Sequence, residues 1–140
     1  MAVALTLFAL LAATCFTVLG SANVNAQAAQ GAPDSIKLLT FYEKGCCKSC
    51  ADIDTYIGET LNTYYPDLVS SGKISAQYFD LKKDQAMADK YGAKNWALKM
   101  VVTRNGQETV VDVPEIWMYT GNRDASISCL KTAIDKQLGK

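Results

Sequence analysis

The change from strand to helix near Gly45 constrains the fold more than any other feature of the sequence. Residues 36–42 (IKLLTFY) form a short, almost wholly apolar run of strand-forming residues. Over Cys47–Tyr65 apolar residues instead recur at helical spacing, and Pro66 ends this predicted helix. Asp54 falls in its first turns, where the helix dipole favours negative charge. Because the first run is nearly continuous in apolar residues, it predicts a central strand covered on both faces.

The rest of the chain continues this alternation. The pattern predicts strands at Ile74–Leu81, Leu98–Arg104 and Gln107–Val113, helices at Asp84–Tyr91 and from Asn122 or Asp124 to Leu138, and a helical turn at Glu115–Met118. Asn105-Gly106 joins two of the strands and is the strongest short signal for a hairpin. The first strand–helix–strand unit should have parallel strands, and the hairpin adds an antiparallel edge. The order β-α-β-α-β-β-α therefore predicts an α/β fold, a central mixed sheet flanked by helices.

The N-terminal third of the chain has a different composition. Every charged side chain lies at or after Asp34, and residues 2–19 are almost wholly apolar. This layout predicts a secretory signal peptide at residues 1–26, with cleavage after Ala26 or, alternatively, after Ala28. No Lys or Arg precedes the apolar run, and the alternative is an uncleaved N-terminal anchor. Both alternatives place the remainder in the periplasm or another extracytoplasmic space, where disulfides persist.

The remaining composition limits the function. Residues 27–35 are small and polar and are expected to form a linker, and residues 36–140 are expected to form one domain. The formal net charge is zero, which argues against nucleic acid as a partner and against membrane contact other than through the N-terminal segment. The chain has no histidine and no glycine-rich phosphate loop. The sequence therefore predicts no cofactor.

Three cysteines in the sequence GCCKSC (residues 45–50) stand where the predicted strand ends and the helix begins. The unpaired backbone N–H groups and the positive dipole end of a helix N-terminus stabilise a thiolate, and Lys48 adds a positive charge. Cys47 is therefore the predicted nucleophile. Cys50 follows nearly one turn later and is the predicted resolving cysteine, which attacks a mixed disulfide and releases the partner. In this setting Cys-x-x-Cys predicts a redox-active disulfide, typical of a thiol–disulfide oxidoreductase or a reductase subunit.

The cysteines leave alternatives open. Cys46 and Cys50 form a Cys-x-x-x-Cys motif, a spacing that holds copper on some related folds. Such copper sites normally recruit a histidine, and this chain has none. The three thiolates of the cluster could also bind Cu(I) or Zn(II) as a metal-binding module. A third alternative is a structural subunit whose cysteines form a stable disulfide or remain buried thiols. Cys129 is either a small, half-buried packing residue or the disulfide partner of Cys46. The main prediction is redox exchange without a metal.

In the order of its elements, the chain resembles the thioredoxin superfamily over about residues 36–138. The residues that carry the resemblance are the strand Lys37–Tyr42, the motif Cys47-Lys48-Ser49-Cys50 on the following helix, and the Asn105-Gly106 hairpin. The resemblance implies a thioredoxin-like fold with thiol–disulfide exchange.

A narrower resemblance is to the nitrophenyl compound nitroreductase subunit family, the ArsF-type proteins. It lies in the cysteine pair after the first strand, in Gly72-Lys73-Ile74 before the second, in the hairpin that begins at Leu98, and in Glu115–Met118 before the last helix. It implies a dedicated electron carrier or redox subunit of a system that reduces nitro groups on aromatic compounds. The chain shows no flavin motif, so nitro chemistry would occur on another subunit. The implied partner is another redox protein, either soluble or membrane-associated.

Two departures from ordinary thioredoxins bear on the mechanism. Thioredoxins have a cis-proline just before the strand that faces the cysteine pair. Here that position falls on or near Leu98, and no proline lies between Pro66 and Pro114, so a trans peptide is expected. The Trp-Cys-Gly-Pro-Cys core of thioredoxins is replaced by Cys-Cys-Lys-Ser-Cys. Both departures favour a carrier with one dedicated partner over a general disulfide reductase, with Cys46 as an auxiliary thiol.

Overall fold

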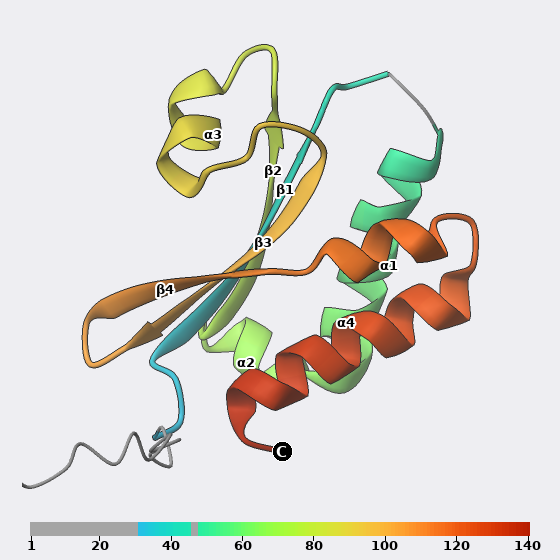
Figure 1. The fold of residues 1–140 in the computed structure, drawn as a ribbon. Helices are drawn as coiled ribbons and strands as arrows, with labels where there is room; N and C mark the ends of the chain where they lie inside the picture. The colour runs from blue at the N-terminus through green and yellow to red at the C-terminus, as the bar shows by residue number, and fades with distance from the viewer. Residues whose placement is uncertain (1–30, 46–47) are drawn as a thin grey trace, which may run out of the picture.

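The computed structural model describes residues 31–45 and 48–140, and all structural statements refer to these residues. Along the chain (Figure 1) its elements are β1 (Ser35–Tyr42), α1 (Lys48–Tyr64), α2 (Pro66–Ser70), β2 (Ile74–Asp80), α3 (Gln85–Tyr91), β3 (Ala97–Arg104), β4 (Gln107–Asp112), the 3₁₀ helix η1 (Pro114–Tyr119) and α4 (Arg123–Leu138).

The strands form one mixed sheet with the order β2-β1-β3-β4. β1 runs parallel to β2, with Ile36 opposite Ile74, and antiparallel to β3, with Phe41 opposite Ala97. β3 and β4 form an antiparallel hairpin at one edge. A parallel strand–helix–strand unit followed by a hairpin and a helix is the thioredoxin-like topology, so the predicted fold is confirmed.

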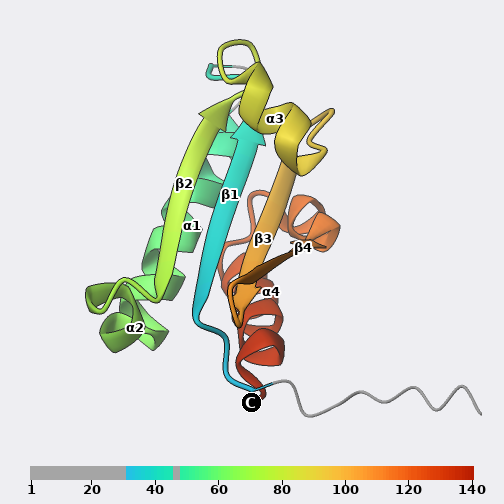
Figure 2. The ribbon, with the colours of Figure 1, turned by 90° about the vertical axis from the view of Figure 1, so that its left-hand side faces the viewer.

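Helices cover both faces of the sheet (Figures 1 and 2). α1 and α4 pack on one face, and α3 lies on the other, where Figure 2 shows it in front of the strands. The larger core lies under α1 and α4 and includes Ile36, Leu38, Ile53, Ile57, Leu98, Met100, Leu130 and Ile134. The smaller core lies under α3 and consists of Leu39, Phe41, Phe79, Ala88, Tyr91, Ala93 and Val101. β1 contributes alternate residues to both cores because successive side chains of a strand point to opposite faces, and the predicted central strand is confirmed.

The hairpin and the last helix follow their sequence signals. Asn105 and Gly106 both have positive φ angles, of 52° and 76°, as a two-residue hairpin of the primed type requires. The predicted cap of α4 is Asn122, whose side-chain oxygen accepts a hydrogen bond from the backbone N–H of Ala125 at 3.1 Å. These local interactions favour the hairpin turn and the start of α4.

Two short helices differ from the predictions. Pro66 does follow the end of α1, but it also begins α2, which was not predicted. Proline suits the first position of a helix because its missing N–H would have no partner there. The single turn predicted at Glu115–Met118 is longer, because η1 begins at Pro114 and ends at Tyr119.

No helix in residues 31–45 and 48–140 is long and apolar enough to span a membrane.

Candidate functional site

The candidate site lies at the end of the sheet where β1 stops and α1 begins. Cys46 and Cys47 fall outside the described residues, so their predicted roles remain predictions. Cys50 is described, lies in the first turn of α1 and is 1 % exposed. Lys48 begins the helix and is exposed to solvent. The structure therefore places Cys50 at the junction of strand and helix that the sequence predicted.

The first turn of a helix is a favourable place for sulfur chemistry. The backbone N–H groups there have no partner within the helix, and the dipole presents its positive end. The first turn of α1 carries no acidic residue that would oppose a thiolate. Asp54 follows in the second turn of α1, within the first turns as predicted, and it has a hydrogen-bond partner outside the helix.

That partner is Tyr42, the last residue of β1. The Tyr42 hydroxyl donates a hydrogen bond of 2.6 Å to Oδ2 of Asp54, and the Tyr42 side chain is buried. Burial raises the pKa of Tyr42 far above its usual value, and the hydrogen bond and charge of Asp54 raise it further. Smaller contributions to this pKa come from Tyr78 and from Cys50. Tyr42 is therefore a neutral hydroxyl within electrostatic reach of the cysteine.

A second tyrosine supports this arrangement from β2. The Tyr78 hydroxyl donates a 3.1 Å hydrogen bond to the backbone carbonyl of Tyr42, and the two rings lie 4.4 Å apart. The sequence analysis missed both tyrosines and the role of Asp54. One signal was present, because Ile36, Leu38 and Tyr42 share the face of β1 that packs against α1.

Leu98 does not lie at the surface beside the cysteines. It is the second residue of β3, opposite Thr40 of β1, and its side chain is buried in the larger core. The residue just before β3 is Trp96, and β3 begins beside the end of β1. None of the described peptide bonds is cis. The cis-proline-equivalent position, on or near Leu98, stays a prediction, and the exposed residue next to the start of β3 is Trp96.

Apolar side chains form a rim at this end of the molecule. Trp96 is 48 % exposed and Met118 is 71 % exposed, and the rings of Trp96 and Trp117 lie 6.2 Å apart. The two tryptophans line an open cavity of about 660 Å³ that also contacts Glu43, which follows β1. The exposure of Trp96 shows that packing does not use its whole side chain.

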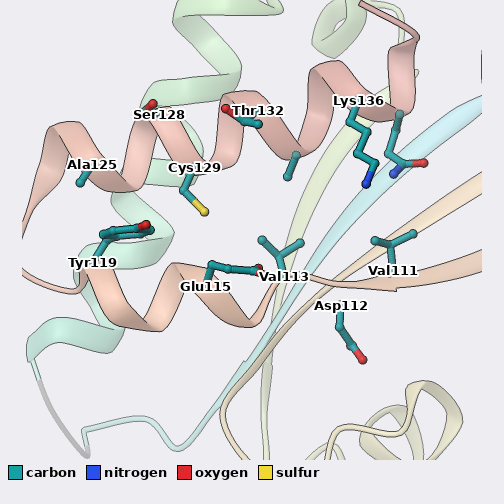
Figure 3. A pocket seen from close by; sticks show the side chains of 12 residues that line it. Val111, Asp112, Val113, Glu115, Tyr119, Ala125, Ser128, Cys129, Thr132 and Lys136 are labelled. Carbon is teal, nitrogen blue, oxygen red and sulfur yellow. The ribbon is translucent and has the colours of Figure 1, made fainter.

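Cys129 lies away from this end, in a groove between α4 and the segment that joins β4 to η1 (Figure 3). The groove has a volume of about 520 Å³, and Cys129 points toward Glu115 and Val113 from the α4 side. Burial raises the pKa of the Cys129 thiol, and the Glu115 carboxylate raises it further. Cys129 has no disulfide partner among the described residues. Its half-buried packing is as expected, and the alternative pairing with Cys46 is untested.

The described part of the chain contains no group of three His, Cys, Asp or Glu residues placed to hold a metal ion. Because Cys46 and Cys47 are outside that part, the three-thiolate metal site is untested.

Comparisons with known proteins found distant similarity to solved structures alone. No protein-family model and no curated protein matches the chain. Among solved structures, a thioredoxin of Plasmodium falciparum is 18 % identical and covers 75 % of this chain and 83 % of its own, with a TM-score of 0.48. Mitochondrial thioredoxin 3 of Saccharomyces cerevisiae is 13 % identical over 65 % of this chain and 79 % of its own, with a TM-score of 0.41. A thioredoxin of Malassezia sympodialis is 18 % identical over 71 % of this chain and 78 % of its own, with a TM-score of 0.40. The thioredoxin-like fold rests on the strand order and strand directions described above.

Proposed function

We propose that the chain is an exported thiol–disulfide redox protein in which Cys47 exchanges disulfides with a partner and Cys50 resolves the mixed disulfide. The observation that carries this proposal is the position of Cys50. It is buried in the first turn of α1, directly after the central strand of a thioredoxin-like sheet. Cys47 precedes Cys50 by three residues, a spacing that allows dithiol and disulfide to interconvert with little backbone movement.

The chemistry follows from this pair. The Cys47 thiolate attacks a disulfide of the partner, and one partner sulfur leaves with the electron pair. Cys50 then attacks Cys47 in the mixed disulfide, which releases the second partner sulfur and leaves a Cys47–Cys50 disulfide. The partner is reduced by two electrons and the dithiol is oxidised by two. The burial of Cys50 suits a resolving role, because an external disulfide cannot reach a buried sulfur.

The apolar rim supports a protein as the partner. Trp96 is large, exposed and apolar and directly precedes β3, which begins beside the end of β1. Met118, also exposed and apolar, follows Trp117, whose ring lies 6.2 Å from that of Trp96. Exposed aromatic and methionine side chains are enriched at protein interfaces. The rim is limited to a few residues, which fits transient docking better than a permanent complex.

The finer proposal is a dedicated carrier or redox subunit that serves one partner, as in a nitroaromatic-reductase-type system. It is supported by the resemblance in sequence and by the absence of proline at Leu98, where general disulfide reductases have one. Export to the periplasm or another extracytoplasmic space is supported by the apolar, uncharged N-terminal segment. The nitro group itself would be reduced on another subunit.

The experiment that tests this function is capture of the mixed disulfide. The full chain with Cys50→Ser should form a stable disulfide with its partner through Cys47, because the resolving thiol is missing. The covalent complex is isolated under non-reducing conditions and the partner is identified by mass spectrometry. Cys47→Ser in the same protein should capture nothing, and Cys129→Ser should leave capture unchanged.

The rim has its own test in the same assay. Met118→Asp should lower the yield of the trapped complex, whereas Val110→Asp should leave it unchanged. Val110 is also an exposed apolar residue, but it lies on β4, on the far strand of the hairpin.

Protein purified without oxidant should also be analysed for metals. Near-stoichiometric copper or zinc that is lost with Cys46→Ser would replace the redox proposal by the metal-binding alternative.

A further inference from the structure

The outer edge of β4 presents backbone groups that a further strand could use. β4 pairs with β3 on one side, and the described residues place no strand on its other side. In an antiparallel pair, alternate residues form hydrogen bonds to the neighbouring strand. Val113 donates its backbone N–H to the Leu98 carbonyl at 3.1 Å, which shows that the odd-numbered residues of the strand bond to β3. The backbone N–H and C=O groups of Glu108, Val110 and Asp112 therefore point outward.

This edge lacks the features that usually prevent strand addition. Proteins protect edge strands with lysines, prolines or β-bulges. The sequence of β4, QETVVD, contains no lysine and no proline, and its pairing with β3 is continuous from Gln107 to Asp112. All of β4 except the half-buried Val111 is exposed to solvent. The edge is therefore accessible to an extended chain along its whole length.

The two faces of β4 differ in chemistry. Val110 lies opposite Val101, a residue of the smaller core, so Glu108, Val110 and Asp112 have their side chains on the α3 side of the sheet. Val111 lies on the other side and lines the groove of about 520 Å³ between α4 and the segment that follows β4 (Figure 3). A strand added to β4 would stand beside this groove. Its side chain opposite Val111 would point to the groove side.

The charges along the edge favour a basic partner. Asp112 binds Lys99 at 2.5 Å, but the Asp112 side chain is 64 % exposed and can accept further hydrogen bonds. Glu108 lies 4.0 Å from Lys37, and both side chains are exposed, so this ion pair is weak. Glu115, which follows β4, forms none of the salt bridges among the described residues. An added strand would therefore meet three accessible carboxylates.

A second copy of β4 fits this edge poorly. Antiparallel pairing centred on Val110 would place Glu108 of one copy directly opposite Asp112 of the other. Like charges directly opposite each other destabilise a strand pair. The edge therefore favours a different chain with basic side chains.

We propose that the outer edge of β4 binds an extended segment of another protein, with Lys or Arg opposite Glu108 and Asp112 and an apolar side chain opposite Val111. The outward N–H and C=O groups of β4 supply the main-chain hydrogen bonds, and the side chains supply the specificity. The basic side chains lie on the α3 side, and the apolar side chain reaches the groove beside Val111. This surface is separate from the apolar rim, and binding there does not require disulfide exchange.

The test uses a synthetic peptide, Lys-Leu-Val-Thr-Lys with both ends blocked, designed to lie antiparallel to residues 112–108. The ¹⁵N-labelled full chain is titrated with this peptide and followed by NMR. The backbone amide signals of Glu108, Val110 and Asp112 should shift. N-methylation of the peptide valine, whose N–H would face β4, should weaken binding by about tenfold or more. N-methylation of the peptide leucine, whose N–H would point away, should change the affinity by less than about twofold.

The charges are tested separately. The peptide Glu-Leu-Val-Thr-Glu should bind about tenfold more weakly than the lysine peptide at low salt, and the difference should shrink at about 1 M salt. Glu108→Lys should weaken binding of the lysine peptide. Asp67→Lys is the control, because it makes the same change of charge at an exposed position on α2 and should leave binding unchanged.

Val110→Pro tests the edge from the protein side. It removes an outward N–H and keeps the hydrogen bonds between β4 and β3, so it should weaken peptide binding. If this variant does not fold, the two N-methylated peptides still decide the question with the parent protein. No shift at about 1 mM peptide, equal loss with both N-methylated peptides, or shifts confined to Trp96 and Met118 would overturn the proposal. A dimer of the parent protein in sedimentation that is lost with Val110→Pro would overturn it in favour of a second copy.

Discussion

The structure contains two buried tyrosines that donate to aspartates, near opposite ends of α1. Tyr42 donates to Asp54 at 2.6 Å at the start of the helix, and Tyr65 donates to Asp135 at 2.7 Å just beyond its end. Burial and the aspartate raise the pKa of both tyrosines. The difference lies in the surroundings, since Asp135 also binds Lys131, whereas Asp54 lies on α1 about one turn after Cys50.

This difference changes the electrostatic surroundings of the two aspartates. Tyr65 joins the end of α1 to α4, and the Lys131 ammonium compensates the charge of Asp135. A carboxylate that already binds a lysine is a poor acceptor for a further proton, and its pKa is lowered, first by Lys131 and then by Tyr65. Asp54 has no lysine or arginine bound to it among the described salt bridges. The same pair of residue types therefore includes a lysine-bound aspartate at one end of α1 and an aspartate near the cysteine-bearing first turn at the other.

The largest expected effect of breaking either tyrosine–aspartate hydrogen bond is on the free energy of unfolding. Tyr42→Phe and Tyr65→Phe should each lower the free energy of unfolding by about 1–2 kcal/mol, because each removes a buried hydrogen bond to a charged group. Urea unfolding followed by circular dichroism measures both values. Tyr78→Phe is the control, since it removes a hydrogen bond to a backbone carbonyl instead of one to a carboxylate, and this loss should have a smaller effect. A loss with Tyr42→Phe several times larger than with Tyr65→Phe would contradict the view that the two bonds are alike in energy.

Alkaline pH should affect both pairs in the same direction. The folded-state pKa of each tyrosine is raised above the unfolded value of about 10, so the unfolded chain loses these protons first. Stability is therefore fully present below about pH 10 and falls as the pH rises above it. Unfolding measured across this range should show a shallower decline in Tyr42→Phe and in Tyr65→Phe. An unchanged decline in both variants would show that other groups control alkaline unfolding.

The smallest expected effect is at acidic pH and concerns only the Tyr65 pair. The folded-state pKa of Asp135 is lowered, so its contribution to stability is present above the unfolded value of about 3.9. That contribution is lost as the pH falls through the folded-state pKa. Urea unfolding of Asp135→Asn should accordingly depend less on pH below about pH 4 than that of the parent protein. Lys131→Met should weaken the dependence in the same way, and a dependence unchanged by both substitutions would argue against this ion pair.

The sequence predicted what depends on local chemistry. The apolar run of β1, the Asn105-Gly106 turn and the Asn122 cap each carry their structure in a few neighbouring residues, and each was found where expected. The helix that begins at Pro66 was missed because proline was interpreted only as a helix end. The Tyr42–Asp54 bond was missed because it joins residues 12 apart on different elements, and only the packing of α1 on β1 brings them together. For the same reason, Trp96 could not be placed at the surface until the start of β3 was known.

A redox titration of the full chain tests the central claim most directly. The protein is equilibrated in mixtures of reduced and oxidised glutathione or dithiothreitol, its thiols are alkylated, and the state of each cysteine is read by peptide mass spectrometry. The account predicts that Cys47 and Cys50 convert together as one two-electron couple with a potential above about −300 mV, higher than that of most structural disulfides. Cysteines that stay in one state across the whole range, or a couple formed by Cys46 with Cys50, would contradict it.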